Sequence, residues 1–143
     1  MIDSLLSTPT IRMLEQTMSF TEQRHQVLAE DIANIDTPGF VQRDLSVAQF
    51  QKALREAVTR NRESLNDVFA PESGDTLEFE PGGSRVQATA QEKPVGVPFH
   101  DRGVRSMEYL MSEMADNALA RNIAAQFLKS RYDQLARAIS MKI

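Results

Sequence analysis

The sequence predicts a mainly α-helical protein, in which long N- and C-terminal helices pair as a coiled coil or helical bundle around an irregular central segment. Two observations lead to this prediction. Apolar residues recur every three or four positions at both ends of the chain. Between residues 71 and 98, by contrast, lie four of the six prolines and four of the six glycines, which favour turns over regular elements. The 143 residues are enough for one ordinary domain.

The first helix is expected over residues 9–34, about 40 Å long at 1.5 Å per residue. Thr8 is suited to cap its N-terminus, and Pro9 fits the first helical position, where its missing N–H is not needed. A heptad seam follows, interrupted by two polar residues. Its positions are Ile11, Leu14, Met18, Thr21, His25, Leu28, Ile32 and Ile35.

The helix is expected to end near Asn34, because Thr37 precedes a proline and is pushed out of helical geometry. Pro38 and Gly39 suit the two central positions of a type II turn, with the glycine supplying the positive φ.

A second, shorter helix is expected within residues 45–65, where apolar residues follow helical spacing. From 67 to 103 the chain is expected to be either a flexible segment or a small irregular module, with possible β-strands at 76–79 and 85–89.

The strongest predicted element is a C-terminal helix over residues 104–140, roughly 55 Å long. Its seam alternates four and three without a break, and Leu119, Ile123 and Phe127 are expected to widen the same apolar face. The seam positions are Met107, Met111, Met114, Ala118, Arg121, Ala125, Leu128, Tyr132, Leu135 and Ile139. The methionines favour a pliable core stripe, which is also compatible with adapting to non-equivalent neighbours.

The two end segments carry opposite charge. Residues 1–35 hold two basic and five acidic residues, a net charge of −3, whereas residues 121–143 hold five basic and one acidic, a net charge of +4. Opposite charges favour a side-by-side arrangement. We therefore expect residues 1–35 and 104–143 to form one discontinuous domain, with 36–103 inserted between them.

Several functional classes find no support in the residues. The net charge of −4 argues against nucleic acid as the main partner, and the absence of cysteine excludes disulfides and thiolate metal sites. No pair of histidines has metal-ligand spacing, and no phosphate-binding loop or nucleophile elbow is present. We expect no enzymatic activity, no cofactor and no small-molecule substrate.

His25 is interpreted as a satisfied polar seam position rather than as a pH-sensitive interface residue.

The first residues of the sequence lack both the basic and the apolar region of a secretory signal peptide. No apolar run approaches the roughly 20 residues that a membrane-spanning helix needs. We expect neither a cleaved signal nor a transmembrane segment.

Residues 33–40 read Ala-Asn-Ile-Asp-Thr-Pro-Gly-Phe. This string resembles the Ala-Asn-x-x-Thr-Pro-Gly-aromatic signature of the rod, hook and hook–filament family of flagellar axial proteins, and it stands, as in that family, after a heptad helix. Residues 113–119, Glu-Met-Ala-Asp-Asn-Ala-Leu, resemble a stretch of the short rod proteins of the family. Arg121 departs from the aromatic residue of many rod proteins, and residues 101–105 depart from the usual start of the last helix.

The resemblance implies that the end helices form an inner coiled-coil domain and that subunits polymerise into the periplasm-spanning basal-body rod, which transmits torque and encloses an export channel. The implied partners are copies of the chain, other rod proteins, the FliE adaptor, the MS ring and the export gate. The implied route is type III export without a cleaved signal. A soluble coiled-coil adaptor or export chaperone remains the alternative.

Together, the seams and the resemblance assign a set of residues to assembly. They are Ile11, Leu14, Met18, Leu28, Ile32, Asn34, Ile35, Thr37, Pro38, Gly39, Phe40, Met107, Met111, Met114, Asn117, Leu128, Tyr132, Leu135 and Ile139.

Overall fold

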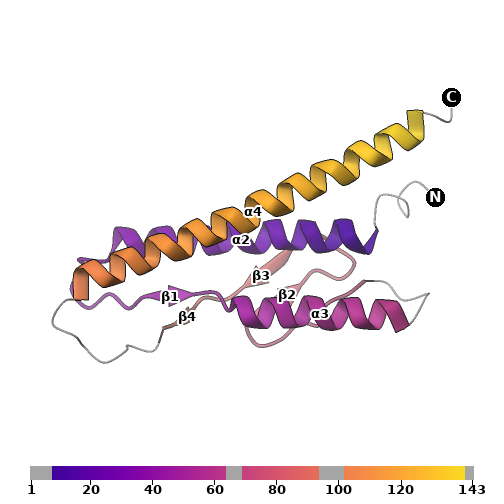
Figure 1. Ribbon diagram of the computed structural model, residues 1–143. Helices are drawn as coiled ribbons and strands as arrows, with labels where there is room; N and C mark the ends of the chain where they lie inside the picture. The colour runs from indigo at the N-terminus through magenta and orange to yellow at the C-terminus, as the bar shows by residue number, and fades with distance from the viewer. Residues whose placement is uncertain (1–7, 64–68, 94–101, 141–143) are drawn as a thin grey trace.

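The computed structural model describes residues 8–63, 69–93 and 102–140. In chain order its elements are α2 (Pro9–Ala33), β1 (Arg43–Asp44), α3 (Val47–Glu63), β2 (Leu77–Phe79), β3 (Val86–Ala88), β4 (Gln91–Glu92) and α4 (Arg102–Ser140). This confirms the predicted mainly α-helical fold. Helix α4 lies along one side of α2, and α3 with the short strands lies on the other side, so that α2 is the middle layer (Figure 1).

The predicted ends of α2 are confirmed. Thr8 is the N-cap, its hydroxyl accepting a hydrogen bond from the Ile11 N–H at 3.4 Å, and Pro9 occupies the first turn. At the other end the Phe40 N–H donates to the carbonyl of Thr37 at 3.2 Å, across a turn in which Gly39 has φ of 79°. The positive φ and the 37–40 hydrogen bond are those of the expected type II turn.

Helix α2 is buried on two faces. The heptad seam, with Ile11, Leu14 and Leu28 buried, faces α4, where the Asn117 side chain donates to the Thr21 carbonyl at 2.8 Å. Phe20 is buried on the opposite side, in the core between α2, α3 and the β2–β3 hairpin. Helix α2 therefore holds buried polar residues, among them Gln16, Thr21, Arg24 and Asp31.

The main hydrophobic core lies beneath the central segment. Its buried members are Phe20, Leu45, Phe50, Leu77, Phe79 and Val86. Phe50 stacks on Phe20 with ring centroids 4.1 Å apart, and on Phe79 with centroids 6.2 Å apart. Each such side chain contributes about 1.5–3 kcal/mol through burial. Within residues 67–103, where either a flexible segment or a small irregular module was expected, the described residues 69–93 pack onto this core. Residues 94–101 lie outside the described part of the chain.

Two strand pairs complete this module. In the β2–β3 pair Glu78 stands opposite Gln87, and the flanking Leu77 and Phe79 point into the core. Both strands fall within the β-prone stretches predicted from the sequence. Strands β1 and β4 form a second antiparallel pair, which had not been predicted because each is only two residues long.

The predicted seam of α4 is partly wrong in register. The most buried residues are Leu110, Asn117 and Ala124, at 0%, 3% and 3% exposure. They alternate with half-buried seam positions: Met107, Met114, Arg121, Leu128 and Leu135. Of the other expected positions, Ala118 and Ala125 are half-buried and Met111 and Tyr132 are exposed, so the most buried positions lie one residue before 111, 118 and 125. The bonds of Glu113 and Asn117 to α2 accompany this rotation of the helix.

A second correction concerns Leu119, Ile123 and Phe127. They do not widen the buried face but remain 59%, 45% and 58% exposed. Within the described residues, no helix is long and apolar enough to cross a membrane.

Gly39 and Gly74 provide a matched test of the turn after α2. A methyl group at either position would meet no atom within 4 Å, but only Gly39 has a positive φ. We expect Gly39→Ala to lower the free energy of unfolding by about 1 kcal/mol, because an L side chain disfavours this conformation. Gly74→Ala should leave it unchanged or raise it slightly. Equal effects in chemical denaturation would show that the turn does not require glycine.

Candidate assembly surfaces and a buried ion-pair cluster

The polar side chains at the interior of this structure connect one helix or strand to another. Within the described ranges, no group of three or more histidine, aspartate and glutamate side chains could hold a metal ion. The best-connected polar side chains instead form an ion-pair cluster at the junction of α2, β1 and α4.

Arg24 is the centre of this cluster, with a side chain only 8% exposed. Its Nε and Nη2 donate to the two carboxylate oxygens of Asp44, each at 2.9 Å, and Nη2 also donates to Glu113 of α4. Lys93, just after β4, brings its Nζ to 3.1 Å from Asp44 and lies over the ring of Tyr109 at 4.8 Å. One guanidinium therefore ties both neighbouring layers to α2.

Arg24 and Asp44 are both held in their charged forms. Burial disfavours the charged form of Arg24, but hydrogen bonds to Asp44 and Glu113 outweigh it and raise the pKa of the guanidinium. Burial alone would likewise raise the pKa of Asp44. The hydrogen bonds and charges of Arg24 and Lys93 outweigh burial here too and lower that pKa below its ordinary value of 3.8.

A second buried carboxylate, Asp31, fixes the end of α2 to β1. Its side chain accepts the backbone N–H of Arg43 at 3.2 and 3.1 Å, and the residue is only 1% exposed. In this case burial dominates over the hydrogen bond and raises the pKa of Asp31. The two aspartates thus respond to pH in opposite directions.

Three polar contacts join α2 to α4 in addition to the Arg24–Glu113 pair. Besides Asn117, Arg121 forms an ion pair with Glu22 at 2.7 Å, and the Tyr132 hydroxyl donates to Glu15 at 2.8 Å. The Arg121 pair is one way in which the opposite charges of the two end segments meet.

The structure distributes the sequence-predicted assembly residues among three environments. Ile11, Leu14, Leu28 and Asn117 are buried. Met18, Ile32, Asn34, Ile35, Phe40, Met107, Met114, Leu128 and Leu135 are half-buried, whereas Thr37, Pro38, Gly39, Met111, Tyr132 and Ile139 are exposed.

Sequence reasoning missed Arg24, Asp44, Glu113 and Lys93. Arg24 lies beside the first seam, between Thr21 and Leu28, where a charged residue is usually solvated. The other three are remote in sequence, and nothing in their spacing marks them as its partners. Only the folded arrangement brings them together.

An apolar stripe remains on the outside of α4. We define the outer stripe as Leu119, Ile123 and Phe127, which lie on one helix face at intervals of four residues. All three are at least 45% exposed, and α4 is therefore apolar both toward α2 and away from it. A helix with two apolar faces is suited to lie between two neighbours.

Comparison with known proteins shows a similarity to flagellar rod proteins. No protein-family model matches the chain. The flagellar basal body rod protein FlgB of Escherichia coli K12 is 26% identical over 133 residues, which cover 92% of this chain and 91% of that protein. FlgB of Proteus mirabilis is 27% identical over 131 residues, covering 92% of each chain. FlgB of Salmonella typhimurium is 34% identical over 58 residues, or 41% of this chain. The chain is thus similar to FlgB rod proteins along most of its length, and the likeness is not confined to the two ends.

Arg24 and Arg121 allow a comparison of two ion pairs that join α2 to α4. Arg24→Ala leaves Asp44 and Glu113 in a mostly buried place without their main partner, and we expect a loss of about 3 kcal/mol or more in unfolding free energy. Arg121→Ala removes a pair whose side chains are 41% and 52% exposed, and the expected loss is below about 1 kcal/mol. Urea denaturation of both variants measures the difference; similar losses would contradict a central role for Arg24.

The two buried aspartates predict opposite pH dependences. The pKa of Asp44 is lowered in the folded state, so its stabilising contribution is present above pH 3.8 and is lost as the pH falls through the folded pKa. The pKa of Asp31 is raised, so its contribution is full below pH 3.8 and is lost as the pH rises through the folded pKa. Asp44→Asn should therefore destabilise more at pH 6 than near pH 3. Asp31→Asn should show the reverse trend, and parallel pH profiles for the two variants would refute this assignment.

Proposed function

We propose that this chain is a structural subunit of the proximal rod of the bacterial flagellar basal body, of the FlgB type, and that it has no enzymatic activity. The observation that carries the proposal is the outer stripe of α4, exposed on a helix that is already packed against α2 on its other side. The similarity to FlgB rod proteins over most of the chain supports the same function. FlgC, another short rod protein, is the next closest resemblance at the level of motifs.

The outer stripe favours assembly over a monomeric role. Apolar side chains gathered on one exposed helix face favour a protein partner. Burying Leu119, Ile123 and Phe127 against neighbouring helices would contribute about 1.5–3 kcal/mol per side chain before the cost of association. The contact would be repeated by every subunit, so that a modest energy per stripe would stabilise a long array.

In this proposal, residues 1–35 and 104–143 form the inner, assembling domain, and residues 36–103 form a module attached outside it. Subunits stack helically around an export channel and transmit torque along the periplasm-spanning rod. The proposed partners are further copies of the chain, other rod proteins, the FliE adaptor, the MS ring and the export gate. Delivery through the flagellar type III system, without a cleaved signal, accompanies this location.

A soluble helical adaptor or export chaperone is the alternative function. It also needs paired helices with an apolar face, but it would cover the outer stripe in a discrete dimer or small oligomer. Open helical arrays, or incorporation into basal bodies, distinguish the rod subunit from such an adaptor. Imaging of purified basal bodies that contain the labelled chain decides between them.

Ile123→Asp tests the outer stripe directly. The side chain is 45% exposed in the subunit, so the unfolding free energy of the isolated protein should change by less than about 0.5 kcal/mol. Assembly should fail, because a carboxylate would be buried among apolar side chains of the neighbour.

Asn122→Asp is the matched control, since it adds the same charge at an exposed adjacent position that lies outside the stripe. The measurement is the yield of rods and hooks in cells that produce each variant as their sole copy. Normal yield from Ile123→Asp would remove the outer stripe from the assembly surface.

A further inference from the structure

We infer that α3 carries a second contact surface, a basic stripe that receives the acidic β2–β3 hairpin of a neighbouring copy of this chain. The inference rests on the proposed function and deepens it, because it assigns a contact to the central module as well as to the end helices. The basic stripe is defined as Lys52, Arg55, Thr59 and Arg62, which follow one another at intervals of three, four and three residues.

The stripe faces solvent because of the way α3 is anchored. Phe50 and Ala57 are buried at 4% and 2% exposure on the core-facing side of the helix. The four residues of the basic stripe lie on the opposite side and are all exposed. Helix α3 thus presents a row of cations along about three turns.

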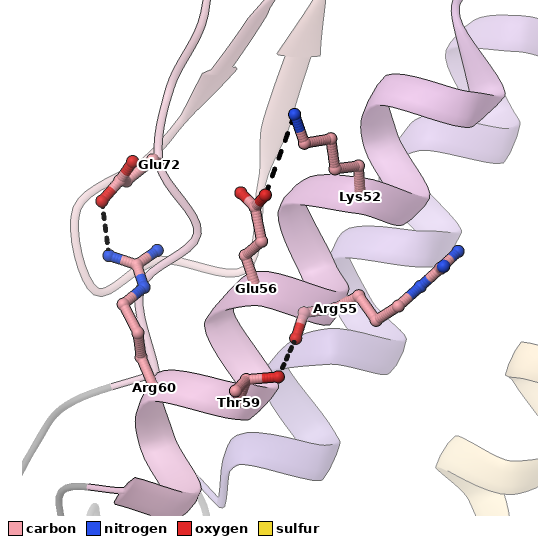
Figure 2. Close-up of a pocket in the computed structure, with 6 residues that line it drawn as sticks. All are labelled: Lys52, Arg55, Glu56, Thr59, Arg60 and Glu72. Carbon is pink, nitrogen blue, oxygen red and sulfur yellow. Dashed lines mark hydrogen bonds and ion pairs between the residues drawn. The ribbon is translucent and has the colours of Figure 1, made fainter.

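The charges of the stripe are only partly neutralised within the subunit. Arg60, beside the stripe, is turned toward Glu72 at 2.7 Å, and Lys52 lies 3.9 Å from Glu56 (Figure 2). The guanidinium of Arg55 points away from both carboxylates and forms no ion pair within the part of the chain that is described. A shallow groove of about 550 Å³ runs beside these side chains and offers room for a partner.

The hairpin provides a surface of opposite charge. Asp75, Glu78 and Glu80 are exposed, and Glu78 points outward because its neighbours Leu77 and Phe79 point into the core. Residues 75–85 contain three acidic residues and one arginine, a net charge of −2. Residues 47–63 contain four basic and two acidic residues, a net charge of +2. The two surfaces therefore complement each other.

Within one subunit Glu78 and the basic stripe do not meet. The stacked rings of Phe50 and Phe79 lie between α3 and the hairpin, and the basic stripe and Glu78 lie on the far sides of that stack. A second copy, by contrast, can place its hairpin against the stripe. A contact between two different patches is heterologous and repeats in one direction, which generates the open array that a rod requires. The charges of this contact would set the register and orientation of neighbouring subunits. The apolar outer stripe of α4 would supply the buried area.

Cross-linking tests this contact in assembled protein. The chain contains no cysteine, so any cross-link between two copies of it joins introduced thiols. Copies that carry Arg55→Cys and copies that carry Glu78→Cys are produced in the same cells, and isolated basal bodies are treated with a bis-maleimide that spans an arginine–glutamate ion pair. We expect a dimer containing both variants. The control pairs Arg55→Cys with Gln26→Cys, at an exposed position on α2. A yield of mixed dimer no higher than in this control would overturn the contact.

Charge exchange provides the second test. Arg55→Glu and Glu78→Arg should each lower rod yield at least about tenfold, since each places like charges opposite one another. The double variant Arg55→Glu/Glu78→Arg should restore the yield, and all three isolated proteins should unfold at the same denaturant concentration. Unchanged yields, or a double variant no better than the singles, would overturn the proposal. The latter result is also the one expected if the stripe binds a different partner.

A failure of the proposed function can be distinguished from a failure of the contact between copies. If the labelled chain is absent from basal bodies, the rod assignment is wrong, and the same cysteine pair is then assayed in concentrated purified protein. Mixed dimers there would retain the contact between copies, and their absence would overturn it.

Discussion

Arg24 constrains the fold more than any other polar residue described, because a single guanidinium bonds to carboxylates on both sides of the central helix. Asp44 belongs to the layer of short strands and Glu113 to the opposite layer, α4. A buried cation requires both partners, since leaving either carboxylate unpaired in a mostly buried place costs several kcal/mol. Arg24 therefore fixes both the rotation of α4 and the path of the chain after the turn at Gly39. As a result, the central module is held in one orientation relative to the α2–α4 pair.

The two faces of α2 stabilise the subunit in different ways. The face toward the module is apolar and aromatic, and the ring centroids of Phe20 and Phe50 are stacked 4.1 Å apart. The face toward α4 mixes leucine and isoleucine with Thr21, whose carbonyl accepts a hydrogen bond from Asn117 of α4. Polar groups within a helical interface add little net stability but favour one register over its alternatives. Such an interface suits a subunit whose end helices must pair in one way before the outer stripe is presented to neighbours.

Much of the fold could be predicted from the sequence, for physical reasons that are local. The Thr8 cap, the turn at Pro38 and Gly39, and the periodicity of the end helices each depend on residues close together in the chain. The register of α4 could not be predicted, because Met111 and Leu110 are both apolar and only long-range bonds choose between them. The Arg24 cluster was missed for the same reason. The outer stripe was visible as apolar residues, but sequence periodicity could not tell that Leu119, Ile123 and Phe127 face away from α2. The assembly roles of these residues remain predictions.

The bond between Arg24 and Glu113 closes 89 residues of chain. Contacts of such large sequence separation form late in folding, because the entropy of closing the loop is lost before any packing compensates for it. Until residues near 113 arrive, the face of α2 that bears Leu28 and Ile11 has no neighbour, and Arg24 has only Asp44. The order of synthesis thus makes the last helix the step that completes the subunit. A chain built in this way stays incompletely folded until its C-terminal helix is available, a property that would suit the proposed delivery through a narrow export channel.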